Sequence, residues 1–344
     1  MWLWLLAGLA GLWLLRRWHR ERQTVPRLSE KFVLITGCDS GFGSLLARRL
    51  DARGLPVLAA CLSEAGAARL RADASSRLQT VLLDVTSSQS IATAAAAAWV
   101  RERVGSQGLW GLVNNAGVVG CIAPAEWLTK EDFAKVLDVN LLGLIEVTLS
   151  LLPLLRRARG RVVNVASVAG RVSFFSGGYC ISKYGVEAFS DSLRREMRPF
   201  GVQVAIIEPG SFQTNLTDSR ALVKSLEQLW QQLPAETQAA YGQGYIHSCE
   251  CLPVGLRHHT ARPGLIPHLC PPDTRTAVRL QPLLSTRLRL VTAAMEHALL
   301  SCCPRSRYSA GWDCRMLFLP LSYCPTCFSD AVLSLLLSCT PRRG

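Results

Sequence analysis

TGCDSGFG, at residues 36–43, is the stretch that decides the fold. It follows the apolar run KFVLIT (31–36) and precedes the amphipathic SLLARRLDARG, so the local order is strand, glycine turn, helix. Because Gly37, Gly41 and Gly43 carry no Cβ, backbone amides and the N-terminus of the helix can approach a pyrophosphate. A tight strand-to-helix corner uses the same glycines, so the motif needs support from the rest of the chain.

Short apolar runs and helical stretches alternate after this turn. The runs are PVLAAC (56–61), LQTVLLDVT (78–86), GLVNNAG (111–117) and RVVNVAS (161–167), with helices expected between the first two and at 88–104 and 131–158. The alternation predicts an α/β, Rossmann-type doubly wound parallel sheet in a single domain. Asp84 ends the third run, where its carboxylate can accept from an adenine amino group or cap the helix that begins near Ser87. Asn114, Ala116 and Gly117 end the fourth, where small residues let a cofactor approach.

The residues around the second run favour NAD over NADP. NADP needs a basic group for its 2′-phosphate, usually in the glycine turn or at the end of the second strand. The turn carries Asp39 instead, and the strand leads into Leu62, Ser63 and Glu64. Two anions repel a phosphate, so we predict NAD(H), with the acid expected at the strand end displaced to Glu64.

Ser167, Tyr179 and Lys183 are the candidate catalytic residues. Tyr179 and Lys183 stand four residues apart at the start of a predicted helix, so both side chains project from one face. An adjacent ammonium favours phenolate, and lowering the usual tyrosine pKa of about 10 by about three units takes roughly 4 kcal/mol. Tyr179 is then an acid/base near neutral pH, and Ser167 is placed to hydrogen-bond the substrate oxygen. The Tyr-x-x-x-Lys spacing also occurs in purely structural helices.

A serine hydrolase is excluded as a competing class. No histidine occurs between Arg20 and Ile246, so the general base of a Ser-His pair is missing from the body of the fold.

The ordered motifs resemble those of the short-chain dehydrogenase/reductase family. They are TGCDSGFG, LDVT, NNAG, the Asn of DVNLLG, the Ser of NVASVAG, YCISK and PGSFQT, and GGYCISKYGVEAFSDSLRRE looks like the microsomal retinol and hydroxysteroid dehydrogenase branch. The likeness is nearly continuous from about residue 28 to residue 246. It implies an NAD-dependent oxidoreductase that interconverts a lipophilic alcohol, retinol or a hydroxysteroid, and its carbonyl.

The resemblance also implies residue roles. Asn140, Ser167, Tyr179 and Lys183 form the implied catalytic tetrad, in which Asn140 holds a water that relays protons to Lys183; the alternative for Asn140 is an ordinary polar residue inside a helix. The implied cofactor contacts are Gly37, Ser40, Gly41, Phe42, Gly43, Asp84, Val85, Asn114, Ala116, Gly117, Asn140, Tyr179, Lys183, Pro209, Gly210 and Thr214. Ser167, Phe174, Phe175 and Phe212 are expected to contact the substrate, and no metal is expected.

Residues 211–245 are expected to form a loop and a helix. Their apolar positions are Phe212, Leu216, Leu222, Leu226, Leu229 and Trp230. They fit a lid over an apolar pocket, or a helix packed on the sheet, and the two interpretations can hold together.

Charge and cysteine content exclude two further classes. The formal net charge is +13, yet residues 31–248 hold only 22 basic against 18 acidic residues, and no basic stripe interleaved with aromatics occurs there. Nucleic-acid binding is therefore not expected. Of the 13 cysteines, Cys38, Cys61 and Cys180 lie in strand or motif contexts and are expected as reduced core thiols, with no disulfide framework.

Residues 1–22 are predicted to be a membrane anchor. MWLWLLAGLAGLWLL carries no charge and is followed by Arg16, Arg17, Arg20 and Arg22. Fifteen helical residues rise only about 22 Å against a hydrocarbon core of about 30 Å, and Trp18 and the arginines extend the reach. A cleaved signal has its charges before the apolar run, so an uncleaved anchor is favoured, in the endoplasmic reticulum membrane with the catalytic domain on the cytosolic face.

The chain divides into four predicted parts: the anchor at 1–22, the NAD-binding catalytic domain at 28–246, an atypical insert-like segment at 247–286, and the end of the catalytic fold at 287–344. The third part is rich in Cys, His and Pro and departs from the family pattern, so a catalytically impaired protein of the same fold is the alternative function. The apolar stretch from Met316 to Leu337 is either membrane-associated or a buried terminal helix. A homodimer is a further expectation.

Overall fold

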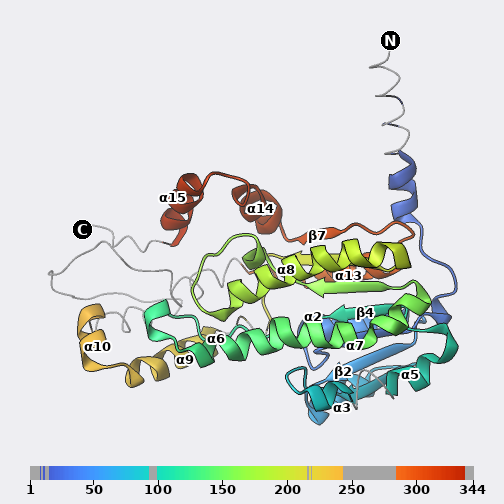
Figure 1. The fold of residues 1–344 in the computed structure, drawn as a ribbon, viewed down its shortest axis with the longest axis horizontal. Coiled ribbons are helices and arrows are strands. Elements are labelled where there is room, and N and C mark those ends of the chain that lie inside the picture. Colours follow the sequence, from blue (N-terminus) through green and yellow to red (C-terminus); the bar gives the residue numbers. More distant parts are fainter. Residues whose placement is uncertain are drawn as a thin grey trace.

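A single parallel sheet of seven strands forms the centre of the computed structural model, which describes Gly8, Gly11 and residues 15–92, 99–214, 217, 219–242 and 284–337. The strand order is β3-β2-β1-β4-β5-β6-β7 (Figure 1). The strands are β1 Val33–Thr36, β2 Val57–Cys61, β3 Leu78–Leu82, β4 Gly111–Asn114, β5 Arg161–Val165, β6 Gln203–Pro209 and β7 Arg307–Ala310. The predicted doubly wound α/β fold is confirmed. The order reverses between β1 and β4, and ligands of such sheets bind at this point, outside the carboxyl ends of the strands.

Helices cover both faces of the sheet. They are α2 Gly41–Ala52, α3 Glu64–Ala72, α4 Ser88–Ser90, α5 Trp99–Val104, α6 Lys130–Leu137, α7 Gly143–Ala158, α8 Gly178–Met197, α9 Ser219–Gln232, α10 Ala235–Tyr241, α13 Arg289–Leu300, α14 Leu319–Leu321 and α15 Thr326–Leu337. Ile35 faces a core shared with α2, α3 and α13, whereas its neighbour Leu34 faces a second core shared with α5, α7 and α8. Alternate residues of a strand point to opposite faces, so a strand buried on both sides is apolar throughout.

Short turns of other helix types connect these elements. The 3₁₀ turns are η1 Leu28–Glu30, η3 Gly105–Gln107, η4 Ala125–Trp127, η6 Val168–Gly170 and η7 Arg198–Phe200, and the π turns are η5 Asp138–Leu142 and η10 Cys314–Phe318. The helix expected at 131–158 is therefore interrupted by η5. Of the helix expected at 88–104, the structure describes the ends, α4 and α5.

Strand β7 was not predicted as a strand. It has four residues, of which Tyr308 and Ala310 are buried, and it pairs in parallel with β6. A run of four residues is too short for the alternation of apolar and polar residues to be recognised in the sequence. The lid region, by contrast, appears as expected, as a loop followed by α9 and α10.

The start of the described chain is fixed to the body. A helix through residues 15–22 is followed by an extended segment in which the Val25 amide donates to the Leu300 carbonyl (2.8 Å). Arg305 donates twice to the Glu21 carboxylate (2.9 and 2.7 Å). The apolar part of the predicted anchor, apart from Gly8 and Gly11, lies outside the described residues.

One helical stretch within the described part, Lys130–Ala158, is long and apolar enough to cross a membrane. It corresponds to α6, η5 and α7, and α7 packs in the core of the fold, so it is weak evidence for a span. Of the insert-like segment predicted at 247–286, the structure describes only residues 284–286. Cys38, Cys61 and Cys180 are free and buried, as expected.

Candidate active site

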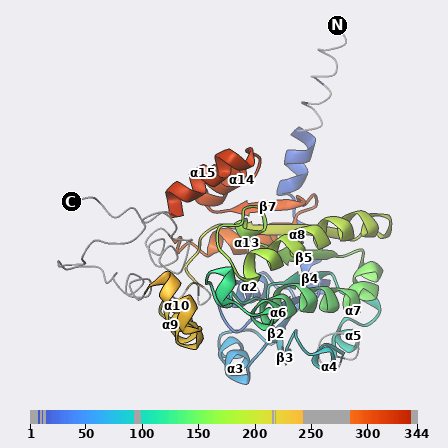
Figure 2. The ribbon, with the colours of Figure 1, turned by 60° about the vertical axis from the view of Figure 1, so that its left-hand side comes forward.

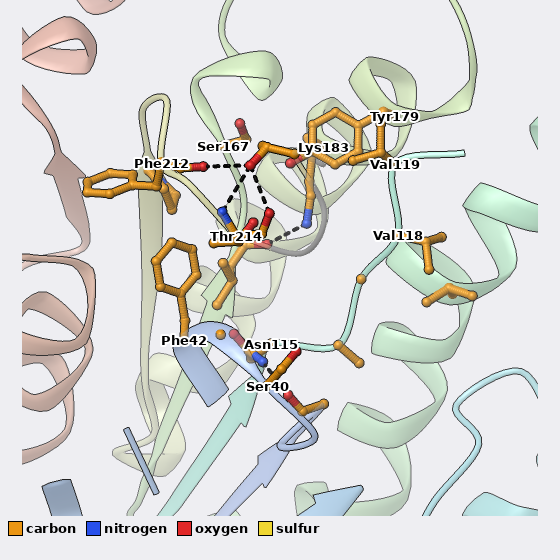
Figure 3. A pocket seen from close by; sticks show the side chains of 18 of the residues that line it. Ser40, Phe42, Asn115, Val118, Val119, Ser167, Tyr179, Lys183, Phe212 and Thr214 are labelled. Atoms are coloured by element: carbon orange, nitrogen blue, oxygen red, sulfur yellow. Dashed lines mark hydrogen bonds between the residues drawn. The ribbon is translucent and has the colours of Figure 1, made fainter. Parts of the chain in front are cut away.

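A pocket of about 550 Å³ lies at the carboxyl edge of the sheet. Figure 3 shows Ser40, Phe42 and Asn115 on one side of it and Ser167, Tyr179 and Lys183 on the other. Of the expected site residues, these line it: Gly37, Ser40, Gly41, Phe42, Asp84, Val85, Ala116, Gly117, Ser167, Phe174, Phe175, Tyr179, Lys183, Pro209, Gly210, Phe212 and Thr214. Gly43, Asn114 and Asn140 do not line it.

The glycine turn needs its glycines for two reasons. Gly37 and Gly41 have φ of +70° and +59°, a left-handed conformation that side chains other than glycine rarely adopt. A Cβ on Gly37 would lie 2.7 Å from the Cα of Ala116, and one on Gly43 would lie 2.3 Å from the Gly37 carbonyl oxygen. Gly43 thus lets α2 pack under the turn, while Gly37 and Gly41 form the pocket wall.

A pair of polar side chains ties the glycine turn to the end of β4. Thr36 Oγ1 accepts from the backbone amides of Asn115 (3.0 Å) and Ala116 (3.1 Å). Asn115 Nδ2 donates to the carbonyls of Thr36 and Gly37, both at 3.0 Å. Sequence reasoning missed Thr36 and Asn115.

Asn115 lines the pocket, whereas Asn114, which was expected there, does not. The Asn114 side chain is buried and donates to Thr148 Oγ1 and Asn164 Oδ1, both at 2.8 Å. Consecutive residues of a strand point to opposite faces, so a shift of one position moves the amide from the pocket into the core.

The side chain of Asp39, from the glycine turn, lies beside the residues that follow β2. Its carboxylate accepts from the amides of Leu62 (2.7 Å) and Ser63 (3.0 Å) and from Ser63 Oγ (2.7 Å). Burial raises the pKa of Asp39, but these hydrogen bonds outweigh burial and hold the pKa below its usual value. Glu64 does not line the pocket and pairs with Arg71, so the acid at this position is Asp39 and the expectation for Glu64 is wrong.

Asp84 borders the pocket without capping a helix. Its Oδ1 accepts from the amide (2.9 Å) and hydroxyl (2.7 Å) of Thr86. Ser87 is the N-cap of α4, since its side chain accepts from the Ser90 amide. Among the described lining residues, Asp39 and Asp84 are the carboxylates and Lys183 is the one cation.

Helix α8 carries Tyr179 and Lys183 one turn apart, as predicted. Lys183 Nζ donates to the Val165 carbonyl at 2.8 Å and lies 5.6 Å from the centre of the Tyr179 ring. Burial lowers the pKa of Lys183 to about 8, and the charge of Glu187, one turn further along α8, opposes that lowering. Ser167 lies at the end of β5, where its Oγ accepts from the Ala169 amide at 3.1 Å.

The expected lowering of the Tyr179 pKa is wrong for this structure. Burial raises the pKa of Tyr179 to about 12, against a lowering effect of the Ser167 hydroxyl. The lysine ammonium is engaged by the Val165 carbonyl, and desolvation of the phenol dominates. Tyr179 is therefore a neutral phenol at pH 7.

Asn140 lies fully buried in η5, behind the pocket wall. Its Oδ1 accepts from the Val118 amide and its Nδ2 donates to the Val118 carbonyl, both at 2.8 Å. Nδ2 also donates to Ser182 Oγ at 3.0 Å. Asn140 therefore holds the segment after β4 against α8, and π turns often occur at functional sites. The predicted water relay stays a prediction.

The other end of the pocket is aromatic. Phe175 stacks on Tyr179 with ring centres 5.8 Å apart, and Phe174 packs edge-on against Phe175 at 4.9 Å. Phe212 packs edge-on against Phe42 at 5.8 Å. Sequence reasoning did not foresee Val118, Val119, Ile122, Val139 and Leu284, which also line the pocket.

Helix α9 serves as both wall and packing element. Leu222 lines the pocket, whereas Leu226 is buried against Trp127, which contacts Trp230 with ring centres 5.2 Å apart. Helix α9 therefore packs on the body of the fold and adds Leu222 to the pocket wall, while its action as a lid stays a prediction. Leu216 lies outside the described residues.

Comparison with known proteins gives consistent matches. A family model described as short chain dehydrogenase matches residues 31–223. The chain is 57% identical to retinol dehydrogenase 7 of Rattus norvegicus, across 97% of this chain and 96% of the relative. It is 53% identical to 17-beta-hydroxysteroid dehydrogenase type 6 of Homo sapiens, across 97% of both. A crystal structure of a short-chain dehydrogenase from Streptomyces avermitilis aligns with a TM-score of 0.56 and 25% identity, covering 89% of this chain and 95% of that one.

Proposed function

The chain belongs to the short-chain dehydrogenase family, and from this premise we propose that it is an NAD-dependent alcohol dehydrogenase that interconverts retinol or a hydroxysteroid and the corresponding carbonyl compound. The observation that carries the proposal is the pocket itself, in which the Tyr179 and Lys183 side chains face a glycine turn across an apolar space. The names of the relatives support a lipophilic alcohol as substrate, and Phe174, Phe175 and Phe212 provide matching walls.

The residues present fit a dinucleotide with a free 2′-hydroxyl. Gly37, Gly41 and Gly117 line the pocket without side chains, and the space beside Gly41 is open. Helix α2 begins in the pocket wall, where a helix N-terminus favours a pyrophosphate. Asp39 at the end of β2 can accept from a ribose hydroxyl and repels a phosphate, which supports NAD over NADP. Asp84 can accept from the adenine amino group, and Lys183 can donate to the nicotinamide ribose.

A nicotinamide cofactor, if held by the glycine turn and Lys183, would supply hydride-acceptor chemistry for the carbinol carbon. Tyr179 exchanges the hydroxyl proton of the substrate through its phenol oxygen. Ser167 donates a hydrogen bond to the substrate oxygen, and Lys183 provides positive charge beside the phenol. Val118, Val119 and the phenylalanines exclude water from the reacting atoms.

The charge state of Tyr179 gives the two directions opposite pH dependences. The neutral phenol, which dominates at pH 7, donates the proton needed for carbonyl reduction. Oxidation needs the phenolate, whose fraction grows about tenfold per pH unit below the pKa. Oxidation should therefore accelerate as pH rises, for as long as Lys183 keeps its charge.

The remaining expectations form part of the proposal. Residues 1–22 anchor the enzyme in the endoplasmic reticulum membrane, and the arginines after the apolar run favour a cytosolic catalytic domain. Residues 28–246 and 287–344 together form the catalytic fold, around the segment 247–286. A homodimer is proposed as the assembly.

The test is turnover by the full-length protein in membranes. With NAD and either all-trans-retinol or a 3α-hydroxysteroid, we expect NADH to form, and with NADP a kcat/KM at least about tenfold lower. Membranes from cells without the protein are the control. A protein that binds NADH but forms none from either substrate would contradict the proposal and favour the catalytically impaired alternative.

A further inference from the structure

The C-terminal segment Trp312–Leu335 exposes large apolar side chains. Trp312 is 62% exposed, Met316 76%, Tyr323 75%, Phe328 55% and Leu335 82%. Helices α14 and α15 form a separate layer outside β7 (Figure 1). Single exposed apolar residues are ordinary, but a run of five along one short segment indicates a surface that something covers.

This surface is joined to the pocket by a line of aromatic rings. Phe318, in η10, stacks on Phe174 with ring centres 5.2 Å apart and planes 29° apart. Phe174 contacts Phe175, and Phe175 stacks on Tyr179. A continuous line of ring contacts therefore joins the exposed segment to Tyr179.

The helix at residues 15–22 leaves the body on the same side. In Figures 1 and 2, which differ by a 60° turn, it stands on the β7 side of the molecule, as α14 and α15 do. Its direction is fixed by the Glu21 carboxylate, which binds Arg305 and also Arg17. In the sequence, this helix follows directly on the uncharged run of residues 1–15.

Charge at the base of this helix fits a lipid surface. Arg16, Arg20 and Arg22 are exposed, and the guanidinium of Arg22 lies 3.7 Å from the centre of the Trp18 ring. Tryptophan and arginine at the end of an apolar helix are typical of the headgroup region, and arginine is attracted to anionic lipid. The one exposed carboxylate of Thr326–Leu335 is Asp330.

We propose that Trp312–Leu335 is a bilayer-docking surface, which rests on the leaflet that residues 1–15 enter and admits substrate from the membrane along Phe318, Phe174 and Phe175. The lipophilic nature of that substrate rests on the proposed function, whereas the docking does not. A bilayer is favoured over a second copy of the chain because the helix at residues 15–22 stands on the same side of the molecule as this surface. Its exposed Trp18 and arginines suit a headgroup region, and in the sequence it follows an uncharged run.

Photolabelling tests the docking without any need for turnover. The full-length protein is reconstituted in vesicles of phosphatidylcholine and phosphatidylserine, with a fraction of the phosphatidylcholine carrying a diazirine in its acyl chain. We expect lipid adducts within residues 312–335 as well as within 1–22. The double variant Met316→Ser/Leu335→Ser should lose most adducts in 312–335, while Leu149→Ser, an equally apolar and 54% exposed site on α7, should keep them. Adducts confined to 1–22, or chain-to-chain cross-links through 312–335, would overturn the proposal.

Kinetics test the substrate route separately. For retinol supplied in vesicles, the double variant should raise KM about fivefold or more with little change in kcat, because less substrate reaches the route. For a water-soluble short-chain secondary alcohol, KM should be unchanged. An equal KM change for both substrates, or none for either, would overturn the route, while absence of turnover in the unsubstituted protein would refute the proposed function and leave the photolabelling result valid.

Discussion

Backbone forms the wall at one end of the pocket, whereas aromatic side chains form it at the other. The glycine-turn end consists of Thr36–Gly43 and Asn115–Gly117, held by four hydrogen bonds between residues at or just after the ends of β1 and β4. The aromatic end consists of Phe174, Phe175 and Tyr179, held by ring contacts that reach the distant Phe318. The first end is encoded in short local motifs and suits a cofactor common to a family, while the second depends on tertiary contacts and suits selection of one substrate.

Among changes to the two pocket ends, the largest effect on binding is expected from Gly37→Ala at the glycine-turn end. The φ of +70° costs about 1–2 kcal/mol for alanine, and the new Cβ would lie 2.7 Å from Ala116 Cα. NAD affinity, measured by calorimetric titration, should fall at least about a hundredfold. Gly54→Ala is the matched control, because Gly54 has φ +85° and nothing within 4 Å of the Cβ position. Equal NAD affinities in the two variants would break the assignment of this end.

Asp39→Asn tests cofactor choice. The amide keeps one acceptor oxygen, for either the Leu62 or the Ser63 backbone amide, and removes the negative charge. The ratio of kcat/KM with NAD to kcat/KM with NADP should fall about tenfold. Glu64→Gln, which removes an acid outside the pocket, should leave the ratio unchanged. If the ratio fell in Glu64→Gln and not in Asp39→Asn, Glu64 would be the acid that selects NAD over NADP.

Phe174→Leu tests whether the aromatic end affects substrate binding without affecting cofactor binding. It removes two ring contacts, with Phe175 and Phe318, each worth about 0.5–1.5 kcal/mol. KM for retinol should rise about threefold to tenfold, whereas KM for NAD should stay within about twofold. A matching rise in both constants would show that the two ends are not separate.

The smallest effect is a shift in pH dependence in Glu187→Gln. Glu187 is buried, pairs with Arg307 and lies near Glu208 and Arg171, and its charge raises the pKa of Lys183. Without that charge, the pKa of Lys183 falls below about 8, so the rise of alcohol oxidation with pH should end about half a unit to one unit lower. Asp191→Asn is the control, because Asp191 pairs with Arg307 but does not act on Lys183. Profiles of kcat/KM from about pH 6 to about pH 10 decide the matter, and an upward shift would contradict the account.

The sequence predicted what short-range patterns determine. Alternating apolar runs predicted the sheet, and the spacing of Tyr179 and Lys183 predicted their shared helix face. The choice of Asn114 over Asn115 failed because one step along a strand reverses the face.

Tertiary properties were out of reach from the sequence. The pKa of Tyr179 depends on burial, and the position of Asp39 depends on how the glycine turn meets β2. The contact between Phe174 and Phe318 leaves no local signal, and neither does the π turn that holds Asn140.

The most direct test of the central claim measures cofactor binding and turnover together in Tyr179→Phe. NADH affinity, followed by fluorescence titration, should stay within about threefold of the unsubstituted protein, because the glycine-turn end is intact. Turnover of retinol or the hydroxysteroid should fall about a thousandfold, because the proton-exchanging hydroxyl is gone. Turnover within about tenfold of the unsubstituted protein, or a parallel loss of NADH binding, would contradict the account.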